Sequence, residues 1–151
     1  MIVAIGFDHA GVPLRPRLLL EIEEAGHEVL DLGTDRPIPI DYPDKALEVA
    51  RAVISGRAER GILVCGSGAG VSVAACKVRG IRAATVHDTY TAHQGVEHDG
   101  VNVLCLGGRV VGSELAAEVV AAFLGATISM QERHVRRRAK VDEIERTEGL
   151  E

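Results

Sequence analysis

The chain has 151 residues, of which 46% are hydrophobic and 26% charged, and this composition predicts one compact domain rather than a disordered or fibrous protein. Its formal net charge is -5, so it lacks the broad positive field that general nucleic-acid or membrane-surface binding requires. We therefore expect no nucleic-acid partner and no membrane partner, and any bound anion must be held locally.

Five apolar runs of strand length recur along the chain, at residues 2–7, 28–32, 61–65, 82–86 and 101–106. Segments with helical periodicity separate these runs. Runs that are apolar throughout belong to strands covered on both faces, and alternation with helices makes the sheet parallel. The predicted fold class is therefore α/β, a Rossmann-like doubly wound sheet of five parallel strands.

Two segments depart from this repeat. Residues 33–44, GTDRPIPIDYPD, contain three prolines and predict a long ordered loop. Residues 131–147 predict a charged C-terminal helix with few apolar positions, which follows a β–α core of residues 1–125 in a single domain of residues 1–151. Docking on a partner subunit would explain this helix, and a solvated, frayed terminus is the alternative that composition leaves open.

The sequence opens on a strand-like run without a basic leader, and no apolar run approaches membrane-spanning length. The three cysteines, Cys65, Cys76 and Cys105, are odd in number and have neither metal-site nor disulfide spacing. We therefore expect reduced thiols in a cytoplasmic protein. No His, Cys or carboxylate cluster has ligand spacing, so we expect no metal.

The most informative stretch is ILVCGSGAGVSVAACK, residues 62–77, in which a strand leads into a glycine-rich turn and then a helix. Its glycines, Gly66, Gly68 and Gly70, let the backbone approach a ligand closely, and free N–H groups at a helix start favour negative charge. The spacing matches neither a P-loop nor the dinucleotide fingerprint. The turn thus predicts an anion site, with a plain strand-to-helix connection as the alternative.

Cys65 lies where this strand meets the turn, and a nearby helix start stabilises thiolate relative to thiol. A thiolate placed there can take a proton from carbon. The alternative is a buried strand cysteine, which is the preferred interpretation for Cys76 and Cys105. Ser67 offers a hydroxyl to a substrate oxygen, although serine is also an ordinary turn residue.

Ligands of doubly wound sheets bind beyond the carboxyl ends of the strands, and this rule selects further residues. Asp8 and His9 follow the first run, and Arg109 follows the last. Asp8 could instead cap the next helix. His98 and Asp99 precede the last run in a predicted loop, where a lone histidine is usually solvated.

The charged tail and the end of the fourth run supply the remaining candidates. Arg133 and Arg137 are four residues apart on one helix face, with His134 between them, and such a pair can grip a phosphate dianion. A solvated basic face is the alternative. The strand-end rule also selects His87 and Asp88.

Eight segments carry a resemblance in their order and spacing: GFDHAG, DLGT, DYPD, ILVCGSGAG, GIRAA, EHDGVNVL, GGRVVG and ERHVRRR. Together they resemble the ribose-5-phosphate isomerase B family, which includes the galactose-6-phosphate isomerase subunits. The match runs from about residue 2 to about residue 140. It implies an aldose–ketose isomerase that needs no cofactor and acts on a phosphorylated sugar, with ribose 5-phosphate as the leading substrate.

The resemblance also implies a role for each matching residue. Cys65 moves a proton between C1 and C2 of the opened sugar through a cis-enediolate, whose charge Ser67 and the turn amides stabilise. His98, with Asp8 as a possible helper, opens the ring, and Tyr42 lines the sugar site. The turn amides belong to Gly66, Gly68, Ala69 and Gly70, and the phosphate is surrounded by His9, Arg109, Arg133, His134 and Arg137.

The resemblance implies a homodimer whose active site is completed across the interface, and whether dimers pair into a tetramer is undecided. The family usually has Asn where this chain has Asp99, and a carboxylate cannot donate to a sugar oxygen. Galactose 6-phosphate, allose 6-phosphate and a tetrulose phosphate are alternative substrates. A non-catalytic phosphosugar-binding module is the alternative from another class, but it gives no reason for Cys65.

Overall fold

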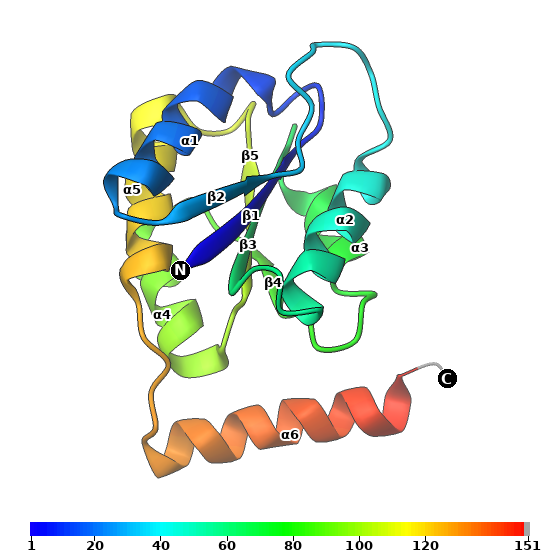
Figure 1. Cartoon of the computed structure of the whole chain (residues 1–151). Coiled ribbons are helices and arrows are strands. Elements are labelled where there is room, and N and C mark those ends of the chain that lie inside the picture. Colours follow the sequence, from blue (N-terminus) through cyan, green and yellow to red (C-terminus); the bar gives the residue numbers. More distant parts are fainter. Residues whose placement is uncertain (150–151) are drawn as a thin grey trace.

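The structure is a computed structural model and describes residues 1–149. Alternating strands and helices form the core (Figure 1). In chain order the elements are β1 (Ile2–Phe7), the short 3-10 helix η1 (Val12–Leu14), α1 (Arg15–Glu24), β2 (Glu28–Asp31), α2 (Tyr42–Ile54), β3 (Arg60–Cys65), α3 (Ala69–Ala75), β4 (Ala83–Thr85), α4 (Thr89–Asp99), β5 (Val103–Gly107), α5 (Ser113–Gly125) and α6 (Glu132–Glu148).

The five strands form one sheet in the order β2-β1-β3-β5-β4, and every pair of neighbours is parallel. Strands β1, β3 and β5 lie in the middle and are buried along nearly their whole length. The predicted α/β fold with five parallel strands is confirmed. All central strands therefore end at the same edge of the sheet.

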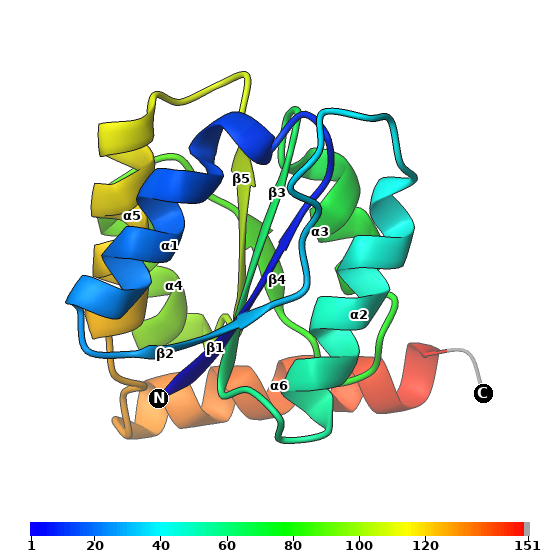
Figure 2. The same cartoon turned by 45° about the horizontal axis from the view of Figure 1, so that its top comes forward.

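Helices cover both faces of the sheet because strand side chains alternate in direction. Val3, Ile5 and Phe7 of β1 pack in the hydrophobic cluster that includes α1, α4 and α5. Ala4 belongs to the other cluster, with residues of α2 and α3. Figure 2 shows these two helical layers on either side of the strands. Cys65 lies in the α2–α3 cluster, so its side chain leaves the sheet on that face.

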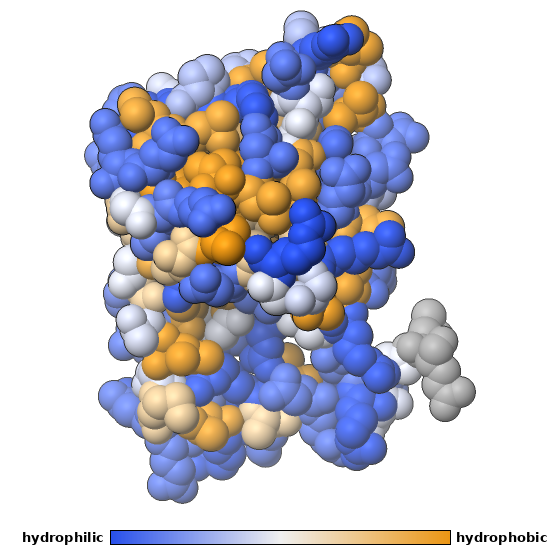
Figure 3. All heavy atoms as spheres, viewed as in Figure 1, coloured by the Kyte–Doolittle hydropathy of each residue, from blue (hydrophilic) through white to orange (hydrophobic). Residues whose placement is uncertain are grey.

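Helix α6 crosses the edge where the strands begin, opposite the edge where they end (Figures 1 and 2). His134 is its one buried residue within the described part of the chain. Its surface is mainly hydrophilic (Figure 3). Docking of this helix on a partner subunit stays a prediction. No helix within residues 1–149 combines the length and apolar character needed to cross a membrane.

The segment predicted as a loop over residues 33–44 is shorter in the structure. Helix α2 begins at Tyr42, so the last three residues form its first turn. Pro43 stands in that turn, where its missing N–H costs no helical hydrogen bond and its fixed φ suits the helix. The turn brings Tyr42 toward the edge where the strands end.

Candidate active site

A cavity lies at the edge where the central strands end. Asp8 follows β1 directly, Cys65 is the last residue of β3, and Arg109 comes two residues after β5. The cavity has a volume of about 390 Å³. It is lined by Asp8, Tyr42, Cys65, Gly66, Ser67, Gly70, Arg109 and Val110. All of these except Val110 were predicted as site residues, and the structure brings them together.

The side chain of Cys65 faces the glycine turn, residues 66–70. Its Sγ atom accepts a hydrogen bond from the Gly68 N–H at 3.1 Å, and only 4% of the residue is exposed. Gly68 has a φ of 81°, in the left-handed region that glycine adopts without strain. The Cys65 side chain therefore lies between the glycine turn and the cavity, where it can contact a ligand.

The glycine turn is held from behind by neighbouring strand ends. The Thr85 hydroxyl donates to the Gly68 carbonyl oxygen at 3.0 Å. The ring of His87 accepts from the Gly107 N–H at 2.9 Å, and the Gly108 N–H donates to the Cys65 carbonyl oxygen at 2.7 Å. His87 thus contacts the main chain behind the turn. The sequence offered no signal for Thr85 beyond its place near the end of the fourth run.

The Ser67 hydroxyl also belongs to the glycine turn. Its oxygen accepts from the N–H of Ala69, the first residue of α3, at 3.2 Å. Accepting this bond leaves the hydroxyl hydrogen to donate toward a ligand. Ser67 can therefore support negative charge that develops on a substrate oxygen.

The sequence left Asp8 either as a site residue or as a cap for the next helix, and the structure contradicts the cap, because neither η1 nor α1 begins with a side-chain cap hydrogen bond. One carboxylate oxygen accepts from the N–H groups of Ala10 and Gly11, at 2.8 and 3.0 Å, so Asp8 orders the turn after β1. The residue is 5% exposed and still lines the cavity. His9 accepts a long hydrogen bond, 3.4 Å, from the Ile40 N–H and lies against the loop before α2. Asp8 and His9 therefore diverge after the strand.

Arg109 places a cation beside the glycine turn. Its main-chain N–H donates to the Gly66 carbonyl oxygen at 3.0 Å. A Cβ atom on Gly66 would lie 3.4 Å from Nη1 of Arg109, so the guanidinium passes close over this glycine. A guanidinium in this place can hold an anionic group of a bound ligand.

The other predicted residues form a second group, which we call the α4–α6 cluster: His98, Asp99, Arg133, His134 and Arg137. His98 lies in the last turn of α4, not in a loop as predicted, because the helix continues to Asp99. Helix α4 follows β4 and runs back over 11 residues, about 16 Å at the usual helical rise. The cluster therefore lies at the edge opposite the Cys65 cavity.

His134 organises the α4–α6 cluster. Its ring stacks on that of His98, with centroids 4.0 Å apart and an interplanar angle of 28°. Arg133 Nε donates to His134 Nε2 at 3.2 Å, and His134 Nδ1 lies 2.8 Å from the Ser129 hydroxyl. Burial lowers the pKa of His134, and electrostatic interaction with His98 and with the Arg133 and Arg137 guanidinium groups lowers it further. The neutral ring fits this pattern, since Nε2 must accept.

The other two cysteines differ from each other. Cys105 is fully buried, and burial raises the pKa of its thiol far above the ordinary range. Cys76 is exposed, so the prediction that it packs in the interior is wrong. It is the C-cap residue of α3 and directly follows Ala75, a buried residue of that helix. Within residues 1–149 no three His, Cys, Asp or Glu side chains form a group that could hold a metal ion.

Val110 is the cavity residue that sequence reasoning missed. It follows Arg109 and is 57% exposed. The sequence signal for Val110 is its place directly after Arg109, in the segment that follows the end of β5.

Comparisons with known proteins agree with this geometry. The family model described as Ribose/Galactose Isomerase matches residues 3–141. Ribose-5-phosphate isomerase B of Escherichia coli (strain K12) is 45% identical over 124 residues, 82% of this chain and 83% of that protein. D-erythrulose-4-phosphate isomerase of Pectobacterium atrosepticum is 41% identical over 128 residues, 82% of each chain.

A solved structure extends the similarity to three dimensions. Ribose-5-phosphate isomerase B of Clostridium thermocellum matches with a TM-score of 0.93 and 44% identity, and the match covers 98% of this chain and 99% of that one. The family model spans most of the described chain, including the glycine turn and the start of α6. The chain therefore belongs to the ribose/galactose isomerase family.

Proposed function

We propose that this protein interconverts ribose 5-phosphate and ribulose 5-phosphate, with Cys65 as the base. At the coarser level the chain is a sugar-phosphate isomerase of its family. The observation that supports the finer proposal is the contact between Cys65 Sγ and the Gly68 N–H, which stands in a cavity of about 390 Å³ at the strand ends. A cavity of this size suits a short sugar phosphate.

The proposed proton transfer uses the groups that line this cavity. With the open-chain aldose bound, the Cys65 thiolate removes the proton from C2, and the electrons of that bond form a double bond to C1. Negative charge then develops on the oxygen at C1, where Ser67 and the turn amides can donate hydrogen bonds. The proton of the C2 hydroxyl passes to the oxygen at C1, and return of the carbon-bound proton from the Cys65 thiol to C1, as the C2 carbonyl forms, gives the ketose. Atoms and electrons balance without any co-reactant.

Ring opening must come before this transfer, because ribose 5-phosphate exists in water mainly as a furanose. We assign ring opening to His98, with Asp8 as its helper. The topology separates His98 from the Cys65 cavity within one chain. We therefore propose a homodimer in which His98 of one copy reaches the Cys65 cavity of the other, an isologous arrangement that repeats the site twice.

The phosphate is then held by both copies. His9 and Arg109 come from the copy that supplies Cys65, and Arg133 and Arg137 come from the other. The side chains of Arg133 and Arg137 are exposed on α6, as residues that meet a partner's ligand must be. His134 stays hydrogen-bonded to the Arg133 side chain in this arrangement.

Asp99 widens the range of substrates worth testing. Its side chain is exposed at the end of α4, next to His98. A carboxylate there can accept from a sugar hydroxyl but cannot donate to a sugar oxygen. Erythrulose 4-phosphate, galactose 6-phosphate and allose 6-phosphate are therefore further substrates to be assayed. A cytoplasmic location also stays a prediction, and it rests on three cysteines that have neither metal-site nor disulfide spacing.

The test is an isomerase assay of the purified protein across tetrose, pentose and hexose phosphates. We expect the highest kcat/KM with ribose 5-phosphate and, in D2O, deuterium at the carbon that receives the proton. A higher kcat/KM with another sugar phosphate would show that this sugar is the preferred substrate, and the proposed mechanism would still apply to it. Binding of ribose 5-phosphate without any conversion or exchange would contradict the proposal.

A further inference from the structure

The C-terminal end of α4 is held by groups from three other segments. The last four carbonyl oxygens of a helix have no partner inside the helix. Here the first of them, on Val96, accepts from the Gly100 N–H at 3.2 Å, and Gly100 has a φ of 70°. The next, on Glu97, accepts from the Ser129 N–H at 2.8 Å. Ser129 lies just before α6, so this bond already joins the two elements.

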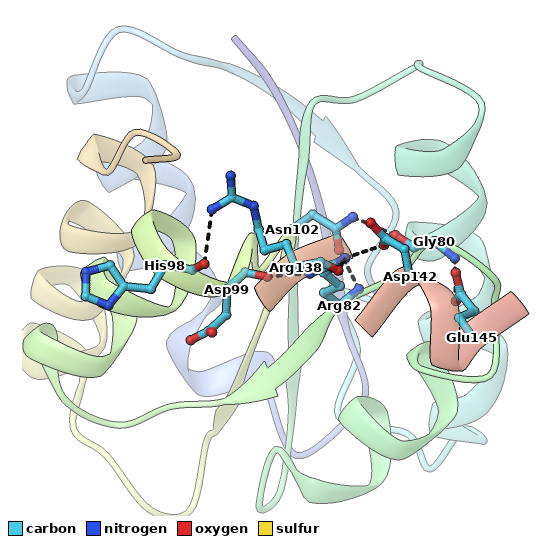
Figure 4. A network of polar contacts seen from close by, with 8 residues as sticks. All are labelled: Gly80, Arg82, His98, Asp99, Asn102, Arg138, Asp142 and Glu145. Atoms are coloured by element: carbon cyan, nitrogen blue, oxygen red, sulfur yellow. Dashed lines mark hydrogen bonds and ion pairs between the residues drawn. The ribbon is translucent and has the colours of Figure 1, made fainter. Parts of the chain in front are cut away.

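Two arginine side chains take the remaining two carbonyls. Arg138 of α6 donates from Nη1 to the His98 carbonyl oxygen at 3.1 Å. Arg82, just before β4, donates from Nη1 to the Asp99 carbonyl oxygen at 2.8 Å. Figure 4 shows the two guanidinium groups directed at this end of α4. Consecutive peptide groups on both sides of Asp99 Cα are therefore fixed from outside the helix.

The same two arginines are joined to each other and to α6. Arg138 also donates to the Ser129 carbonyl oxygen at 2.7 Å. Arg82 donates to the Arg138 carbonyl oxygen at 3.3 Å and forms an ion pair with Asp142 of α6. Each guanidinium thus bridges α4 to α6 or to the segment before it. A planar guanidinium can serve two acceptors in fixed directions, which a lysine ammonium cannot do as well.

The ring of His98 is fixed by the same segment as its main chain. It stacks on His134, whose Nδ1 contacts the Ser129 hydroxyl. A closed circuit therefore runs from His98 through His134 and Ser129 to Arg138 and back to the His98 carbonyl. Displacing the Arg138 side chain would therefore remove its hydrogen bonds to the His98 and Ser129 carbonyl oxygens together.

We propose that Arg82 and Arg138 are positioning residues for ring opening, because they fix His98 relative to the phosphate-binding face of α6. This inference rests on the proposed function, in which His98 opens the furanose ring. Neither arginine needs to touch the substrate. Their effect is to hold His98 where it meets the ring oxygen while Arg133 and Arg137 hold the phosphate.

The chemistry of the two sugars separates ring opening from proton transfer. Ribose 5-phosphate must open its furanose before Cys65 can act. Ribulose 5-phosphate cannot form that ring, because the hydroxyl that would close it carries the phosphate. Exchange of a C1 proton of ribulose 5-phosphate with solvent therefore requires Cys65 but no ring opening. The ratio of the two rates therefore reports on ring opening.

The experiment compares both rates, at saturating substrate, in Arg138→Met and Arg82→Met. Methionine keeps much of the side-chain bulk and removes every N–H donor. We expect ribose 5-phosphate turnover to fall at least about tenfold, since a displacement of about 1 Å can cost a hundredfold. The exchange of ribulose 5-phosphate protons, followed by NMR in D2O, should change by less than about twofold. The ratio of the two rates is independent of how much of each sample is folded.

Three further variants complete the design. His98→Asn should lower the same ratio, Arg138→Lys should restore part of it, and Arg136→Met should leave it unchanged, because Arg136 is an exposed neighbour on α6. An equal loss of both rates in Arg138→Met and Arg82→Met, or no loss in either rate, would overturn the inference. Wild-type protein that turns over no ribose 5-phosphate would instead overturn the proposed function, and the inference with it.

Discussion

The phenol ring of Tyr42 fills the space that a side chain on Gly70 would need, since a Cβ atom there would lie 2.8 Å from Cζ of Tyr42. The ring belongs to the first turn of α2 and the glycine to the first turn of α3, so this contact joins two walls of the cavity. Tyr42 is 40% exposed and can turn outward if it is pushed.

The variant Gly70→Ala should therefore fold and lose Tyr42 as a wall of the sugar site. We expect KM for the sugar phosphate to rise about tenfold, which corresponds to about 1.4 kcal/mol of binding. Steady-state kinetics and thermal unfolding measure the two effects. Gly125→Ala is the matched control, because no atom beyond its chain neighbours and its own helix backbone lies within 4 Å of a Cβ there, and it should leave KM unchanged. A wild-type KM in Gly70→Ala would show that Tyr42 does not line the sugar site.

Replacement of Cys65 should remove the chemical step and spare binding. We expect kcat of Cys65→Ala to fall by on the order of 10² to 10⁴ or more, the usual effect of losing a positioned base. Calorimetry should still detect the sugar phosphate. Cys76→Ala removes an exposed thiol outside the cavity and should retain full activity. A raised KM with unchanged kcat in Cys65→Ala would rule out this residue as the base.

Arg137 should matter for the phosphate and little for the proton transfer. A charge-assisted hydrogen bond contributes about 1.5–3 kcal/mol, so Arg137→Ala should raise KM by roughly tenfold to a hundredfold. The kcat value should change much less. Inhibition by inorganic phosphate provides the control, since it should weaken in parallel. Equal phosphate inhibition in the variant and the wild type would place Arg137 outside the phosphate site.

The lowered pKa of His134 predicts that the free energy of unfolding depends on pH. Its pKa in the folded protein is lowered by burial and by electrostatic interaction with His98, Arg133 and Arg137, so the folded state binds fewer protons than the unfolded state. The stabilising contribution of the neutral ring is fully present above the unfolded pKa of about 6.5 and decreases as the pH falls below it. Protonation would also remove the acceptor that Arg133 uses.

Thermal unfolding between pH 5 and pH 8 tests this expectation. The loss of stability toward pH 5 should be smaller in His134→Gln than in the wild type. His27 also has a lowered pKa, mainly from burial, so His27→Gln is needed to separate the two contributions. Parallel stability curves for the wild type and His134→Gln would contradict the prediction.

The core strands could be predicted because the apolar character of each buried strand is visible in one short run of the sequence. Runs such as residues 2–7 are apolar at every position, which only a strand covered on both faces requires. The start of α2 was missed because Pro43 in a proline-rich segment suggests a loop. Proline in the first turn of a helix is equally favourable, and only the packing of Tyr42 against Gly70 distinguishes the two.

The candidate site could be predicted only in part. The strand-end rule reached Cys65 and Arg109, since both stand beside the carboxyl ends of strands. His98 lies at the far end of a helix, and residue pattern alone gives no distance between it and Cys65. The sequence does not indicate that Arg82 and Arg138 bind the end of α4. Every residue has a backbone carbonyl, so an arginine that donates to one requires no particular residue type as its partner.

The most direct test of the whole account is complementation between two inactive variants, Cys65→Ala and His98→Asn. If Cys65 of one copy works with His98 of the other, refolding an equal mixture should restore about one quarter of the wild-type ribose 5-phosphate turnover. Half of the dimers are then mixed, and each of these has one complete site. Turnover of the mixture no higher than that of the separate variants would contradict the shared site.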